Sequence, residues 1–137
     1  MSVEIRRGID RLVERDEGRR TQHSFAFGSA YDPDNLRFGP IVCHDDHLLA
    51  DGRGFDTHRH SGLAVVTYVV SGAVTHAGPT ATEILAAGTI GVWRTGEGDE
   101  HSEVAAAPQT RFVQTWLADD DPPAEPSFAV VEGTSAQ

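Results

Sequence analysis

The stretch LAVVTYVVSGAVTH, residues 63–76, decides the fold class of this chain. Its first eight residues are all apolar, aromatic or β-branched, which is typical of a buried strand. Ser71 and Gly72 interrupt the run, and a second short run follows over residues 73–76. We therefore expect two strands that pair through a tight turn.

The same alternation of short runs and turn residues continues along the chain. Further strand candidates cover residues 82–85, 89–93 and 111–117, with glycine-containing turns at 86–88 and 95–98. Turn signals about every 8 to 12 residues are typical of a sandwich or barrel. A chain of 137 residues has room for one domain. We therefore predict a single all-β domain.

The first twenty residues have no single interpretation. Apolar side chains recur there at helical intervals: Ile5, Ile9, Leu12 and Val13. Gly8 lies inside that pattern and weakens a helix, so a short strand at residues 3–7 followed by a turn is an equal alternative. We treat residues 1–20 as an amino-terminal arm and residues 21–118 as the folded domain.

The carboxyl-terminal segment, residues 119–137, has a different composition. It begins with three Asp, contains three Pro and shows no periodicity. Such a segment does not predict a regular element. We expect an acidic, proline-containing tail that packs on the domain or is disordered.

Charge and cysteine content exclude several classes of protein. Eleven Arg and no Lys stand against 21 acidic residues, for a net charge of −10, so binding to nucleic acid is not expected. Cys43 is the one cysteine, which excludes an intramolecular disulfide and a cysteine-based zinc site. No apolar run approaches the ~20 residues that cross a bilayer, and no secretory leader opens the chain. We expect a cytoplasmic protein that does not bind membranes.

Two pairs of side chains at spacing two carry the chemistry. His58 and His60 flank Arg59, and in a strand they project to the same side, about 6 to 7 Å apart along the backbone. His101 and Glu103 repeat this spacing further along the chain, after a glycine-rich turn. If the two strands lie side by side, three imidazoles and one carboxylate converge on one point.

This set of groups suits a metal ion. Three nitrogen ligands and one oxygen ligand are compatible with Fe, Mn, Co, Ni, Cu or Zn, and they leave coordination positions open for a substrate. The alternative is a set of exposed or hydrogen-bonded histidines without a metal. Burial of four titratable groups without compensation is costly, so one divalent transition metal ion is the simpler explanation.

Several motifs place the chain close to a known family. They are, in order, HSFAFGSAYDP (residues 23–33), FGP (38–40), HDD (44–46), GRGFDTHRH (52–60), VVTYVVSGAVTH (65–76), GEGDEHSE (96–103), RFVQTWL (111–117) and AEPSF (124–128). Together they resemble the amino-terminal cupin domain of the pirin family. The resemblance implies a single cupin domain, which is a double-stranded β-helix or jelly-roll barrel. It also implies a metal held by four side chains: His58, His60, His101 and Glu103.

Similarity to bacterial pirins implies an activity as well. Such proteins are associated with quercetin 2,3-dioxygenase activity, in which the metal binds an enolic hydroxyl of a flavonol for attack by O2. On this hypothesis Glu103 is the catalytic residue, because a ligand that loosens can accept the hydroxyl proton. Iron is our first choice of metal, with Mn, Co, Ni, Cu or Zn as alternatives. A non-catalytic, metal-binding regulatory or interaction protein, or a tailoring enzyme for another enol, stays open, so the sequence does not decide whether the chain is an enzyme.

Two departures from the family pattern bear on this function. Pirins usually carry two cupin domains, whereas this chain resembles a short, single-domain form, whose exposed surface we expect to be buried in a homodimer. The first motif of the family usually has a Glu four residues after the second histidine, where this chain has Ala64. We expect Ala64 to face inward with His58 and His60, so that a second acid–base group is missing.

The other histidines have mainly structural interpretations. We expect His44 and His76 to be hydrogen-bonded structural residues, and His23 and His47 to be exposed to solvent. Asp56 precedes His58 by two residues, so it is expected to cap a loop or to orient the His58 imidazole.

Two tryptophans and a glutamine complete the candidates. Trp93 and Trp116 are expected in the core. Gln114 shares one face of its strand with Phe112 and Trp116, because these residues alternate. The sequence does not show whether that face looks into the barrel.

Overall fold

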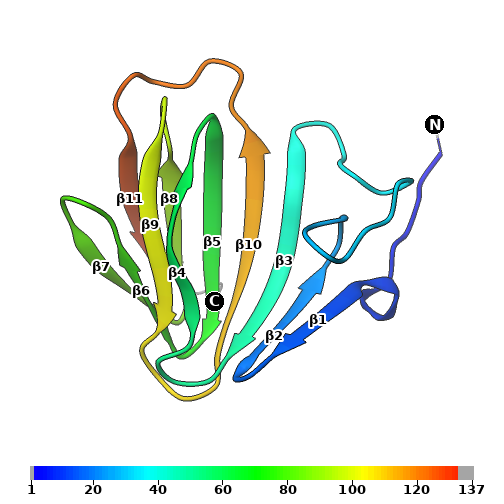
Figure 1. The fold of residues 1–137 in the computed structure, drawn as a ribbon, viewed down its shortest axis with the longest axis horizontal. Coiled ribbons are helices and arrows are strands. Elements are labelled where there is room, and N and C mark those ends of the chain that lie inside the picture. Colours follow the sequence, from blue (N-terminus) through cyan, green and yellow to red (C-terminus); the bar gives the residue numbers. More distant parts are fainter. Residues whose placement is uncertain (1, 133–137) are drawn as a thin grey trace.

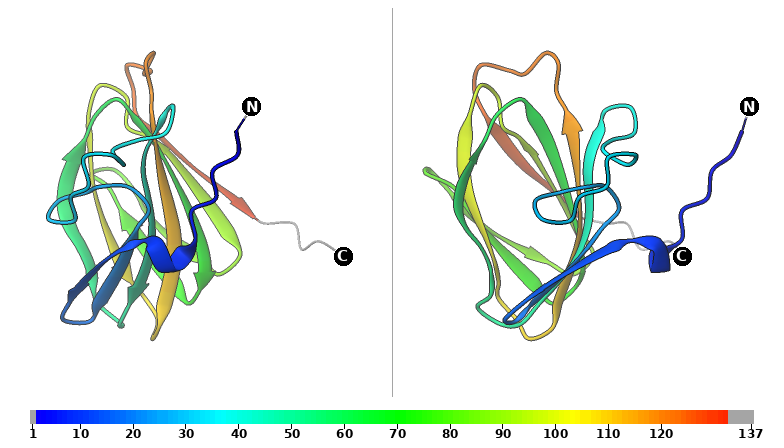
Figure 2. Two further views of the ribbon diagram at one scale, coloured as in Figure 1. Left: turned by 90° about the vertical axis from the view of Figure 1, so that its right-hand side faces the viewer. Right: turned by 45° about the vertical axis from the view of Figure 1, so that its right-hand side comes forward.

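The chain folds into antiparallel strands. Its computed structural model describes residues 2–132, in which the strands are β1 (Leu12–Asp16), β2 (Arg19–His23), β3 (Ile41–Leu49), β4 (Gly54–His60), β5 (Leu63–Ser71), β6 (Ala73–Ala77), β7 (Thr82–Ala86), β8 (Thr89–Arg94), β9 (Asp99–Ala105), β10 (Thr110–Ala118) and β11 (Ser127–Glu132). One sheet has the order β1-β2-β3-β10-β5-β8-β11, and the other has the order β4-β9-β6-β7 (Figure 1). The two sheets face each other across a shared interior (Figure 2). The predicted all-β sandwich or barrel is therefore confirmed.

The chain passes from one sheet to the other after residue 71. β5 and β6 are consecutive, but β5 pairs with β10 and β8, whereas β6 pairs with β7 and β9. Both expected strands exist, but their pairing with each other was a wrong prediction. Gly72 lies at this corner with φ +74°, and a Cβ there would clash with Thr110. The corner therefore requires glycine.

The amino-terminal segment differs from both alternatives that the sequence left open. Residues 2–7 have no regular structure, and η1 (Gly8–Asp10) is a single 3-10 turn. Ile5 and Ile9 are exposed, so no buried face stabilises a helix there. β1 and β2 instead form a hairpin that extends the larger sheet beyond β3, and the expected boundary at residue 20 falls inside β2.

The carboxyl-terminal segment joins the larger sheet. β11 pairs with β8 along its whole length, from Ser127 opposite Arg94 to Glu132 opposite Thr89. The expectation of no regular element in this segment was therefore wrong for residues 127–132, because they complete the edge of the sheet at β8. Residues 133–137 lie outside the described chain. Among residues 2–132, no helix has the length and apolar character needed to span a membrane.

The apolar core lies at one end of the sandwich. Six buried side chains form it, each from a different strand: Leu49, Val69, Val74, Leu85, Ala105 and Phe112. Phe55 and Phe128 pack against this cluster. In the other half of the same strands most inward positions carry polar side chains, namely Asp45, Thr67, His76, His101, Glu103 and Gln114, beside buried Cys43 and Val65. The interior therefore has an apolar end and a mainly polar end.

Replacing Phe112 by alanine tests the position of the core. Phe112 is fully buried among side chains from both sheets, so we expect Phe112→Ala to lower the free energy of unfolding by about 3 to 5 kcal/mol. Val131→Ala, at an exposed position of β11, is the control and should lower it by less than about 1 kcal/mol. Urea denaturation measures both free energies, and equal losses would contradict this core.

Candidate metal centre

Strand pairing brings the two histidine-containing stretches together. β4 and β9 are neighbours in the smaller sheet, and His58 lies directly opposite His101 in their register. A bulge between Phe55 and His58 shifts this register just before the histidines. One ring nitrogen from each of His58, His60 and His101 lies within 4.8 Å of the other two. The two stretches thus lie side by side, which was the condition for their side chains to converge.

Main-chain contacts orient the first histidine. His58 Nδ1 donates a hydrogen bond to the backbone carbonyl of Asp56, at 2.6 Å. Its Nε2 lies 2.8 Å from Nε2 of His101, inside the cluster. A metal-binding imidazole is typically held in this way, by a hydrogen bond from the ring nitrogen that does not bind the metal. Asp56 therefore acts on His58 through its carbonyl oxygen rather than through its carboxylate.

The other two histidines are held neutral. Burial, together with the neighbouring His58, lowers the pKa of His60 to about 4. Burial and the surrounding imidazoles lower the pKa of His101 to about 2. Within residues 2–132, His60 Nε2 is buried without a hydrogen-bond partner, and His101 Nδ1, which also forms no hydrogen bond, has the carboxylate of Glu103 beside it. Neutral imidazoles with free nitrogens are the form that binds a transition metal, so this donor set fits such an ion.

Glu103 lies beside the cluster rather than in it. Its carboxylate is buried, and Oε1 is 3.1 Å from His101 Nδ1. The set of atoms within 4.8 Å of one another contains the three ring nitrogens and no Glu103 oxygen. Burial raises the pKa of Glu103 to about 7, although hydrogen bonds from Gln114 oppose this shift. The structure therefore brings all four expected residues to one place, with the three imidazoles closest together.

Gln114 fixes the orientation of Glu103. Its Nε2 donates to both carboxylate oxygens, at 2.9 and 2.8 Å, and it also lies 3.0 Å from Thr67 Oγ1. Trp116 Nε1 donates to Gln114 Oε1 at 2.8 Å. Because an indole nitrogen only donates, this contact determines which end of the amide faces Glu103. The face of β10 that carries Gln114 and Trp116 therefore looks inward, which the sequence left open.

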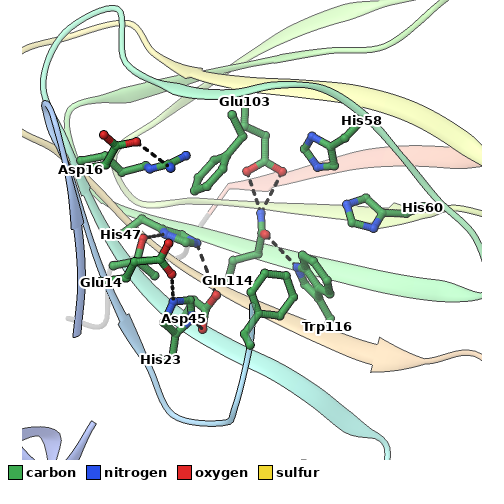
Figure 3. A pocket seen from close by; sticks show the side chains of 14 residues that line it. Glu14, Asp16, His23, Asp45, His47, His58, His60, Glu103, Gln114 and Trp116 are labelled. Atoms are coloured by element: carbon green, nitrogen blue, oxygen red, sulfur yellow. Dashed lines mark hydrogen bonds and ion pairs between the residues drawn. The ribbon is translucent and has the colours of Figure 1, made fainter. Parts of the chain in front are cut away.

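A cavity of about 300 Å³ opens from the cluster. Its walls include three aromatic side chains: Phe27, Phe55 and Trp116. His58, His60 and Glu103 line one part of it, as Figure 3 shows. Trp93 is buried behind the cluster, with its ring centroid 3.9 Å from that of His101, so its expected core position is confirmed, whereas Trp116 forms part of the cavity wall.

The expectation that His23 and His47 face solvent was wrong. Both are buried, with exposed fractions of 3% and 4%, and both line the cavity. They lie in neighbouring strands, where His23 pairs with Asp45 and His47 pairs with Thr21. His47 occupies the same period-two positions of β3 as Asp45 and buried Cys43 and Leu49, and this is the signal that could have identified His47.

Two further expectations differ from the structure. Ala64 does not face inward with the histidines, because buried Val65 and Thr67 occupy the inward positions of β5. Gly62, with φ +64°, lies in the turn before β5, so the alternation of β4 does not continue across it. The absence of a carboxylate at Ala64 therefore removes nothing from the cavity wall.

His44 and His76 have different environments. His44 Nδ1 is 2.7 Å from Thr115 Oγ1, which agrees with a structural role. His76 stacks on Phe128 and has its ring centroid 5.0 Å from that of His101. Its Nε2 is buried without a hydrogen-bond partner among the described residues, so the expected hydrogen bond is missing there.

Comparisons with known proteins agree on one family. A family model described as Pirin matches residues 6–117. A pirin-like protein of Caulobacter vibrioides is 35% identical over 115 residues, which are 82% of this chain and 50% of that protein. The quercetin 2,3-dioxygenase of Escherichia coli is 29% identical over 102 residues, which are 72% of this chain and 44% of that protein. The chain thus spans about half the length of the curated relatives it matches.

Solved structures give the same result. The bacterial pirin YhhW of Escherichia coli, crystallised in complex with nickel(II), superimposes with a TM-score of 0.90 at 25% identity, over 94% of this chain and 57% of that one. KdgF from Halomonas sp. superimposes with a TM-score of 0.63 at 14% identity, over 88% of this chain and 97% of that one, which shows a shared fold alone. The expected cupin-type β-sandwich is thereby confirmed.

Burial of His47 predicts a loss of stability in acid. Burial lowers its pKa to about 4, below the ordinary value of about 6.5. Between these pH values the unfolded chain binds more protons at this ring than the folded one, so stability falls as the pH falls, by up to about 3 kcal/mol for this group. Phenylalanine would keep a ring against Phe55 and Phe112 without a titrating group.

Urea denaturation of both proteins between pH 7 and 4 measures this effect. As the pH is lowered from 7 to 4, the free energy of unfolding of His47→Phe should decrease less steeply than that of the wild type. Parallel pH dependences would contradict a neutral, buried His47.

Proposed function

Because the chain belongs to the pirin family, we propose that it is a metal-dependent dioxygenase that acts on quercetin or a similar enolic aromatic compound. The observation that carries this proposal is a cluster of three neutral imidazoles at an aromatic-lined cavity. Relatives named as quercetin 2,3-dioxygenase support the substrate class.

The proposed metal ligands are the four residues that spacing selects: His58, His60, His101 and Glu103. They suit one divalent transition metal ion, and we propose iron, with Mn, Co, Ni, Cu or Zn as alternatives that the same donor set accepts. When bound, such an ion would supply Lewis-acid chemistry for a flavonol and O2, and redox chemistry as well if it is not zinc.

The side chains of the cavity do the rest of the proposed work. Phe27, Phe55 and Trp116 provide apolar walls for a planar ring system and exclude water from it. Glu103 is the proposed acceptor of the enolic proton, because its carboxylate lines the cavity next to His101. Gln114 holds that carboxylate in one orientation, so it is a positioning residue for Glu103.

Homodimerisation and a cytoplasmic location stay predictions. Apolar side chains of neighbouring strands form a row on the outward face of the larger sheet, where Ile90 pairs with both Tyr68 and Val131. About half of the surface of Tyr68 and of Val131 is exposed to solvent. Such a row is compatible with an interface between two copies of the chain.

Metal binding is the first test. The purified protein should bind one equivalent of a divalent transition metal, and His101→Ala should weaken binding at least about 100-fold, because a direct ligand is lost. His44→Ala is the control, since His44 bonds to Thr115 and is not part of the cluster. Competition with a chelating dye measures the affinities, and an unchanged affinity in His101→Ala would contradict the site.

Oxygen consumption with quercetin is the second test. The metal-loaded protein should consume O2 in the presence of quercetin, and Glu103→Gln should lower the rate at least about 100-fold by removing the proton acceptor. Glu100→Gln makes the same change at an exposed position of β9 and should keep the wild-type rate. Metal binding without O2 consumption on quercetin or another enol would instead favour a regulatory or interaction role.

A further inference from the structure

The cavity has a second polar part that the proposed metal site does not use. On the side away from the histidine cluster, four side chains converge from β1, β2 and β3, as Figure 3 shows: Glu14, His23, Asp45 and His47. Cross-strand pairing places them, because His23 lies opposite Asp45 and Thr21 lies opposite His47. Alternate residues of a strand share a face, so this ladder lines the cavity.

Two carboxylates hold the ring of His23. Its Nδ1 is 2.8 Å from Asp45 Oδ1, and its Nε2 is 3.0 Å from Glu14 Oε2. Burial lowers the pKa of His23, but the hydrogen bonds and charges of Asp45 and Glu14 outweigh burial and raise it above the ordinary value. Asp45 therefore uses Oδ1 for His23, and among residues 2–132 no N–H or O–H group donates a hydrogen bond to its Oδ2.

His47 presents a hydrogen-bond donor to that oxygen. Its Nδ1 lies 2.8 Å from Thr21 Oγ1, and its Nε2 lies 3.9 Å from Asp45 Oδ2. The neutral ring carries one proton, and the negative charge of Asp45 favours the tautomer with this proton on Nε2. Nδ1 then accepts from the Thr21 hydroxyl. An N–H group and a carboxylate oxygen thus face each other across 3.9 Å.

One hydroxyl group fits this pair. The distance is too long for a direct hydrogen bond, but an oxygen atom beside the line that joins the two atoms can lie about 2.8 Å from each. A hydroxyl accepts from His47 Nε2 and donates to Asp45 Oδ2, whereas an ether oxygen cannot donate and an ammonium cannot accept. A carboxylate or phosphate would meet the negative charges of Asp45 and Glu14 and be repelled.

We propose that Asp45 and His47 form a hydroxyl-binding subsite, which recognises a hydroxyl group on the part of a planar aromatic substrate away from its metal-binding group. The assignment rests on the proposed function for the identity of the ligand. Phe55 supports the subsite, because its ring centroid is 4.9 Å from that of His47 and its side chain also lines the cavity. The two residues therefore determine specificity for hydroxylated substrates.

Equilibrium binding of two flavonols tests the subsite without relying on turnover. The probes are quercetin and 3-hydroxyflavone, which keeps the metal-binding hydroxyl and ketone but has no other hydroxyl group. Each is titrated into metal-loaded protein in the absence of O2, and tryptophan fluorescence is followed, because Trp116 lines the cavity. The wild type should bind quercetin at least about tenfold more tightly than 3-hydroxyflavone.

Two variants should remove this preference. His47→Phe keeps an aromatic ring and removes the donor, so the ratio of the two affinities should fall below about threefold while 3-hydroxyflavone binds as before. Asp45→Asn places an amide donor where the acceptor was, so it should also remove the preference. This variant tests the subsite if His47→Phe does not fold. Glu17→Gln removes a carboxylate from the same amino-terminal hairpin outside the cavity, so it should keep the wild-type ratio.

The outcomes separate the two proposals. If the wild type binds both flavonols equally, or if both variants keep the wild-type ratio, the subsite is overturned and the dioxygenase proposal stands. If neither flavonol binds the metal-loaded wild type, the flavonol assignment fails and the subsite fails with it.

Discussion

The pairing of β4 with β9 is the constraint on which the whole site depends. In this register His58 lies opposite His101, and a shift by one residue would turn every side chain of β4 to the other face. Gly54 allows the two backbones to approach, because a Cβ at that position would clash with the backbone of Glu103. The bulge after Phe55 then sets the positions of the histidines. Neither stretch forms the cluster alone, so the site exists only in the folded sheet.

The division of the interior into an apolar end and a polar end follows from the same strands. The apolar end closes the sandwich and supports the strands, while the polar end leaves a cavity. Buried polar groups are tolerated when they are paired, and Gln114 links the two sheets by donating to Glu103. Among residues 2–132, the buried imidazole nitrogens without partners belong to His60, His76 and His101. These imidazole nitrogens thus gather where a metal is proposed to bind, whereas Arg20 Nε and Asn35 Oδ1 are unsatisfied elsewhere.

The sequence predicted the features that depend on local pattern. Short β-branched runs between glycine turns correctly indicated β5, β6, β7, β8 and β10, and the period-two spacing of the histidines identified two stretches that could share a site. The runs gave no indication of β1, β2, β3 or β11. Pairing between strands is not local, so the assignment of β5 and β6 to different sheets could not be inferred from their run lengths. The expected exposure of His23 and His47 was wrong, because polar partners offset the cost of burying both imidazoles. These partners, such as Asp45 for His23, come from a neighbouring strand, so the pairing register of β2 and β3 determines them.

The central claim is that His58, His60 and His101 together hold one metal ion. Anomalous X-ray diffraction from crystals of the metal-loaded protein, recorded at the absorption edge of the metal, tests it most directly. The account predicts a single strong peak about 2.0 to 2.3 Å from one nitrogen of each ring. A peak bound elsewhere on the chain, with the three imidazoles free of metal, would contradict it.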